Sequence, residues 1–162
     1  MSLKEIIQQK LAAGEAHVII FSRHVATTDI PNADALRAAF IPGSTWKNLA
    51  LVGITAKMTG AGRVVAYRGS GITTWPSSGG FDSDVLSSMP TAHGAAISYG
   101  IDAAGFRGIP FTDAIDLDLW ESPLIVRKET LVAATGSVQL ALQNDSGAAK
   151  GYTLALKMVA WQ

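Results

Sequence analysis

The residues with the greatest chemical potential are the histidines and a group of closely spaced aspartates. His17, His24 and His93 lack the His-x-x-x-His and His-x-His spacings of zinc sites, and the chain has no Cys to complete a ligand set. His17 and His24 are an odd number of residues apart in one predicted strand, so they lie on opposite faces. We interpret all the histidines as structural or surface residues, and we expect no metal and no cofactor.

Asp113, Asp116 and Asp118 raise the question of a calcium site or of paired acids for glycoside hydrolysis. Asp116 and Asp118 share the outer face of a predicted strand, roughly 7 Å apart from twice the strand rise. No Asp-x-Asp-x-Asp-Gly loop is present, and no partner acid can be named. We therefore expect solvated charges on an exposed face.

Nucleophilic and phosphate-binding motifs are missing from the sequence. There is no Gly-x-Ser-x-Gly elbow, no Gly-x-x-x-x-Gly-Lys-[Ser/Thr] loop and no Rossmann fingerprint, and Gly60-x-Gly62 falls in a predicted hairpin turn. An enzyme would need an acid or base constellation that these residues do not supply. We predict that the protein is not an enzyme and has no catalytic residues.

The tryptophans are better candidates for binding, because all of them fall at predicted strand edges or in loops. A tryptophan there can stack on a sugar, anchor a subunit contact or close the end of the core. Trp75 lies in the Gly-, Ser- and Pro-rich stretch Gly69–His93, which we expect to project or to pack on a partner. Trp161 packs either into a neighbouring chain or into its own domain. The interface candidates are Leu3, Ile6, Ile7, Leu11, Trp46, Trp75 and Trp161.

Several of these candidates belong to a helix predicted over residues 2–14. Ser2 followed by Glu5 is a capping-box signature, and Gly14 suits the position after the last turn. Leu3, Ile6, Ile7 and Leu11 form one apolar stripe, so a helix this short must dock to be stable. It docks either on its own domain or on a neighbouring chain.

The remaining elements are mostly strands. We expect a strand over 17–25, a second short helix over 32–40, and a hairpin in which Lys47–Met58 and Arg63–Arg68 flank a turn at Thr59–Gly62. The C-terminal third alternates strictly between apolar and polar residues, with Asn144–Lys150 as a hairpin loop. The inward positions are Ile115, Leu117, Leu119, Val138, Leu140, Leu142, Tyr152, Leu154, Leu156 and Met158. We predict a mainly β protein: an antiparallel, jelly-roll-like β-sandwich spanning 15–162 as one domain, with a helical appendage at 1–14.

Charge and composition narrow the choice of partners. The chain has 13 basic and 13 acidic residues, which argues against nucleic acid and anionic membranes as partners. The absence of Cys suits folding in a reducing cytoplasm, and with no signal-peptide core we expect a soluble protein that is not secreted. Charged residues make up only 16% and apolar residues 48%, against a charged share of about 25% in typical domains. Either the chain is a well-buried monomer whose surface is rich in Ser, Thr, Gly and Ala, or neighbouring subunits cover part of its apolar surface; we favour the second.

Residues 120–132, with 136–142 and 151–161, resemble the C-terminal strands of β-sandwich virion proteins of tailed bacteriophages, in the class of head decoration (cement) or fibre proteins. The resemblance covers about the last quarter of the chain and implies a homo-oligomer, with a trimer favoured, that folds in the host cytoplasm and binds the major capsid protein or another virion protein. The alternative is a carbohydrate-binding sandwich that uses Trp46 or Trp75 as a stacking platform.

Overall fold

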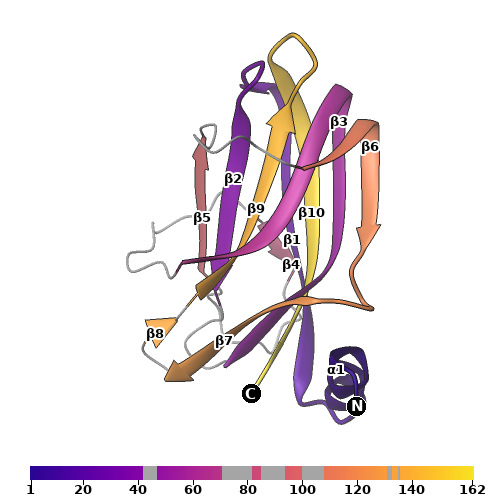
Figure 1. The fold of residues 1–162 in the computed structure, drawn as a ribbon, viewed down its shortest axis with the longest axis vertical. Coiled ribbons are helices and arrows are strands. Elements are labelled where there is room, and N and C mark those ends of the chain that lie inside the picture. Colours follow the sequence, from indigo (N-terminus) through magenta and orange to yellow (C-terminus); the bar gives the residue numbers. More distant parts are fainter. Residues whose placement is uncertain (42–46, 71–81, 85–93, 100–107, 131–132, 135) are drawn as a thin grey trace.

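The computed structural model describes residues 1–41, 47–70, 82–84, 94–99, 108–130, 133–134 and 136–162 of the chain. These residues form one helix and an antiparallel, mainly β body (Figure 1). The elements in chain order are α1 (Leu3–Ala12), β1 (Ala16–Ile30), β2 (Ala35–Ile41), β3 (Asn48–Ser70), β4 (Asp82–Asp84), β5 (Gly94–Tyr99), β6 (Ile109–Asp118), β7 (Leu124–Thr130), β8 (Ala133–Ala134), β9 (Gly136–Asn144) and β10 (Lys150–Trp161).

Strand β3 organises the sheet. The strand order is β4-β1-β10-β3-β9-β2-β5, and every pairing is antiparallel. The first half of β3 pairs with β10 and its second half with β9, while β6 follows β3 past the register break between Met58 and Ala61. Figure 1 shows β3 bending over at the upper end of the molecule. The sheet therefore curls back on itself around β3.

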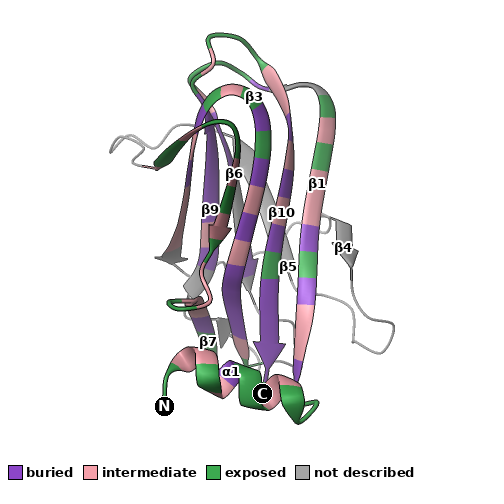
Figure 2. Ribbon diagram, turned by 90° about the vertical axis from the view of Figure 1, so that its right-hand side faces the viewer, coloured by how far each residue is buried: buried purple, intermediate pink, exposed green. Residues whose placement is uncertain are grey.

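The main core fills the inside of this curl. Strict alternation along β10 places Leu154, Leu156 and Met158 inside, each 0% exposed, as apolar positions of period two require (Figure 2). Val138, Leu140 and Leu142 do the same from β9, whereas Ile115 and Leu117 of β6 are partly buried against the cluster. The predicted alternation of the C-terminal third is confirmed.

The helix predicted over 32–40 is wrong, because this segment is strand β2, paired with β9 and β5. Leu36 and Phe40 are both 0% exposed in the core. Their spacing of four residues puts them on one side of a helix and equally on one side of a strand. Pairing on both sides of β2 decided between the two periods.

The predicted hairpin between Lys47 and Arg68 is also wrong. The glycines read as its turn lie inside one bent strand, whose two halves do not pair with each other. Gly60 has φ +97°, and a Cβ built at Gly62 would approach Met58 Cε to 2.7 Å and Phe111 Cζ to 2.8 Å. The glycines therefore serve a close-packed bend. Likewise, the loop that follows Asn144 joins β9 to β10, but these strands pair with β3 and not with each other.

Most of the predicted loop Gly69–His93 lies outside the described residues. The part that is described extends β3 to Ser70 and adds the short strand β4, which pairs with β1 through Ser22 and Asp82. A strand therefore interrupts the stretch that composition alone marks as a loop.

Candidate functional site

Helix α1 packs on the outer side of the sheet at its lower end. Ile7 is 0% exposed and Trp161 is 4% exposed, in a second apolar cluster with Ala50, Val52 and Val159. Leu3 and Leu11 are partly buried against this cluster, and Ile6 is half-buried. Figure 2 shows the helix lying across the ends of β1 and β10, near the C-terminus. Within this chain, the helical stripe and Trp161 thus pack on each other and on the sheet.

Local chemistry fixes where this helix begins and how it is held. The Ser2 hydroxyl accepts a hydrogen bond from Glu5 N–H, and Ser2 N–H donates to Glu5 Oε2 at 2.6 Å, which completes the predicted capping box. These bonds from Ser2 lower the pKa of Glu5. Lys4 forms an ion pair with Glu121 beyond β6, and this hydrogen-bonded carboxylate raises the pKa of Lys4. The helix is therefore tied to the body by charge as well as by packing.

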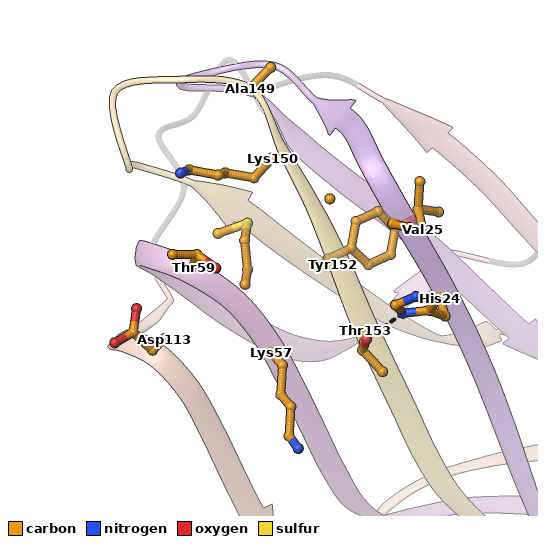
Figure 3. Close-up of a pocket in the computed structure, with 12 residues that line it drawn as sticks. His24, Val25, Lys57, Thr59, Asp113, Ala149, Lys150, Tyr152 and Thr153 are labelled. Carbon is orange, nitrogen blue, oxygen red and sulfur yellow. Dashed lines mark hydrogen bonds between the residues drawn. The ribbon is translucent and has the colours of Figure 1, made fainter.

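At the opposite end, the strands part and leave an open groove of about 680 Å³ (Figure 3). The pairing of β1 with β10 breaks between Val25 and Ile30, and the pairing of β3 with β6 breaks between Met58 and Ala61. The floor is the start of β10, where Ala149 and Gly151 add little side-chain volume. The groove thus lies where β1 shifts register against β10 and where the pairing of β10 with β3 ends at Thr153 and Lys57.

Polar and positively charged side chains line this groove. His24, Thr153 and Lys57 are successive cross-strand neighbours on β1, β10 and β3. His24 Nδ1 and Thr153 Oγ1 share a hydrogen bond of 2.7 Å. Lys150 and Thr59 also line the groove, and Figure 3 shows the Lys57 and Lys150 side chains pointing away from each other. The lining therefore holds two separated cations together with hydroxyl groups, an imidazole and the Asp113 carboxylate.

The aspartates have local structural partners, consistent with their outward positions on β6. Asp116 accepts a hydrogen bond from Thr55 Oγ1 at 3.1 Å, and Asp118 accepts one from Trp120 N–H at 2.9 Å. Asp113, with φ +67°, accepts a hydrogen bond from Gly60 N–H at 2.8 Å. Among the described residues no group of three or more His, Cys, Asp or Glu side chains is arranged to hold a metal ion.

A second, more apolar cleft of about 460 Å³ lies between the two limbs of β3, beside β6. Ile54, Val64, Leu117 and Leu124 contribute to its lining. Ile109, at the start of β6, stands at this cleft with half of its surface exposed. Within the described part of the chain, β6 pairs with β3 alone, so its other edge is unpaired there. The sequence alone does not reveal this cleft, because its walls come from the two limbs of β3 and from β6, which meet only in the folded chain.

Of the remaining sequence candidates, Trp46 and Trp75 lie outside the described residues, as does His93. Trp120 is half-buried beside the helix cluster, and the Lys157 ammonium group lies 5.8 Å from its ring centre. No helix in the described ranges has the length and apolar character needed to cross a membrane.

Comparison of the chain with protein-family models, with curated proteins and with solved structures found no match. The candidate sites therefore rest on the geometry of this chain.

Proposed function

We propose that this chain is a non-enzymatic structural protein of a virion: a homo-oligomer, with a trimer expected, that binds the capsid surface as a decoration or cement protein. The single observation that carries the assembly part is the apolar cleft beside β6, which combines an unpaired strand edge with the half-exposed Ile109. A second copy of the chain is the occupant that fits the low charged share of 16%, because subunit contacts cover apolar surface.

The pattern of strand pairing supports a finer assignment of the fold, a jelly-roll-like sandwich. At the bend, β1 is followed by β2 and β9 is followed by β10, whereas β3 and β6 each pass the bend as one continuous strand. A jelly roll pairs its strands in this way, as one long antiparallel hairpin folded over on itself. Virus capsid proteins and lectins both use that architecture, and the resemblance of residues 120–132, 136–142 and 151–161 to phage virion proteins favours the first.

The structure also removes some sequence-based reasons for expecting assembly. The apolar stripe of α1 and the ring of Trp161 are already covered by the chain itself. An oligomer contact through them would first have to expose Ile7, which is 0% exposed. The proposal therefore moves the subunit contact from the helix to the β6 edge.

Light scattering coupled to size-exclusion chromatography tests the subunit contact. The wild-type chain is expected to be oligomeric at micromolar concentration, and Ile109→Glu is expected to shift it toward monomer. Ile20→Glu is the matched control, because Ile20 is 40% exposed on β1, away from the cleft. A monomeric wild-type protein would contradict the assembly proposal.

The virion role needs a separate measurement. Mass spectrometry of purified particles, from a phage whose genome carries this coding sequence, is expected to detect the chain at a fixed copy number relative to the major capsid protein. Particles that lack the chain, while the infected cells contain it, would contradict a virion role.

A further inference from the structure

The groove between β1, β10 and β3 carries an excess of positive charge that the described residues do not neutralise. Lys57 and Lys150 line it, and no described acid pairs with either of them. Asp113, the one acid of the described lining, accepts a hydrogen bond from Gly60 N–H at 2.8 Å and offsets one of the two lysine charges, so the described lining keeps an excess of one positive charge. Elsewhere on the described surface, Lys4, Lys10 and Arg63 each have a carboxylate partner, whereas Lys157 lies by the ring of Trp120.

We propose that this groove binds an acidic oligosaccharide, with one carboxylate or sulfate group at Lys57 and a second at Lys150. Binding here is independent of the subunit contact proposed at β6, because the two clefts have no lining residue in common. The proposed contacts are charged and hydroxyl groups, unlike the stacking expected for Trp46 or Trp75, and none of the described tryptophans lines the groove.

The placement of the two lysines favours a ligand with repeated charges. The two side chains point away from each other (Figure 3), so one carboxylate at one position would contact only one of them. A chain of acidic sugars carries a charge on each unit. The volume of about 680 Å³ also falls within the range of roughly 300–1,000 Å³ typical of small-ligand sites.

The hydroxyl and imidazole groups of the lining favour a saccharide over an acidic peptide. Thr59 and Thr153 present hydroxyl groups, and His24 adds a ring nitrogen besides the one that contacts Thr153. These groups match the hydroxyls of a sugar. A peptide would gain most from a free strand edge, but at Thr153 β10 is paired with β1 on one side and with β3 on the other.

Isothermal titration calorimetry with defined probes tests the proposal on the full chain. Trigalacturonic acid is expected to bind, while the neutral trisaccharide maltotriose is not. Raising the ionic strength from about 0.01 M to about 0.1 M, which shortens the Debye length from about 30 Å to about 10 Å, is expected to weaken the binding. Triglutamate that binds as tightly as trigalacturonic acid would overturn the assignment to a saccharide, and no binding of trigalacturonic acid would overturn the proposal.

Charge-removing variants localise the binding. Lys57→Gln and Lys150→Gln are each expected to weaken trigalacturonic acid binding about three- to tenfold, the range for partly exposed charged contacts. Lys157→Gln is the matched control: it removes the same charge from β10, but Lys157 lies by Trp120 and outside the groove. An equal loss in the control would mean nonspecific attraction and overturn the proposal. A shift of the His24 ring signals in NMR on adding the probe gives a second readout that does not depend on any variant.

Discussion

The side-chain amide of Asn144 donates a hydrogen bond of 2.9 Å to the carbonyl oxygen of Ile30, 114 residues earlier in the chain. The same side chain also donates to Ala148 O and accepts from Ser146, and it belongs to a residue that is 0% exposed. Through its backbone, Asn144 exchanges hydrogen bonds with Ala33 and Asp34. One residue therefore joins the connection from β1 to β2 to the connection from β9 to β10.

Replacement of Asn144 tests this junction. Asn144→Ala is expected to lower the free energy of unfolding by about 2–3 kcal/mol, because it leaves buried partners without hydrogen bonds. Urea denaturation followed by tryptophan fluorescence measures the change. Ser146→Ala is the control with a smaller expected loss, since the half-buried Ser146 keeps its backbone bond to Asn144 Oδ1. Equal losses in the two variants would contradict a central role for Asn144.

The bend of β3 predicts a contrast between two glycines. Gly62→Ala is expected to destabilise the fold by about 1–3 kcal/mol, the range for overpacking a filled site. The new Cβ would lie 2.7 Å from Met58 Cε and 3.0 Å from the carbonyl oxygen of Gln143. At Gly53 the nearest atom is 3.5 Å away, so Gly53→Ala should leave the midpoint of thermal unfolding nearly unchanged. A Gly62→Ala midpoint equal to that of wild type would argue against a close-packed bend.

Docking of α1 on its own sheet predicts that Ile7 contributes to stability. Ile7→Ala is expected to cost about 2–5 kcal/mol, as for other large-to-small changes in cores, and to speed hydrogen exchange throughout the helix. Gln8→Ala alters an exposed position of the same helix and should leave exchange slow. The effect of Ile7→Ala should not depend on protein concentration. A dependence on concentration would instead indicate that the helix docks on a neighbouring chain.

The capping box predicts that the helix terminus is sensitive to acid. Hydrogen bonds from Ser2 lower the pKa of Glu5 from its ordinary value of 4.5. The ionised form therefore stabilises the folded state fully above pH 4.5, and the contribution is lost as the pH falls through the lower folded value. The protection of first-turn amides against hydrogen exchange, corrected for the intrinsic pH dependence of exchange, should fall over that acidic range. Glu5→Gln should exchange faster already at neutral pH and lose this acid-dependent step; if it keeps the step, Glu5 is not the responsible group.

Local patterns were enough to predict elements whose signals depend on neighbouring residues alone. The capping box of Ser2 and Glu5 fixed the start of α1, because its hydrogen bonds span a single turn. Alternation in β9 and β10 identified the buried side of each strand, since a period of two admits one inward set. Of the groove residues, His24 and Asp113 are candidates from the sequence alone, but Lys57 and Lys150 carry no pattern that joins them.

Tertiary structure decided the features that depend on distant segments. The spacing of Leu36 and Phe40 suits a helix and a strand equally, and pairing with β9 and β5 made the segment a strand. Gly60 and Gly62 are turn residues by composition, yet the packing of Ser146 and Phe111 against them makes a bend within one strand. The sequence by itself determined the mainly β character, the helix and the inward faces. Only the pairing of strands far apart in the chain determined the curl of the sheet, and with it the groove and the cleft, because their walls come from segments that meet only after folding.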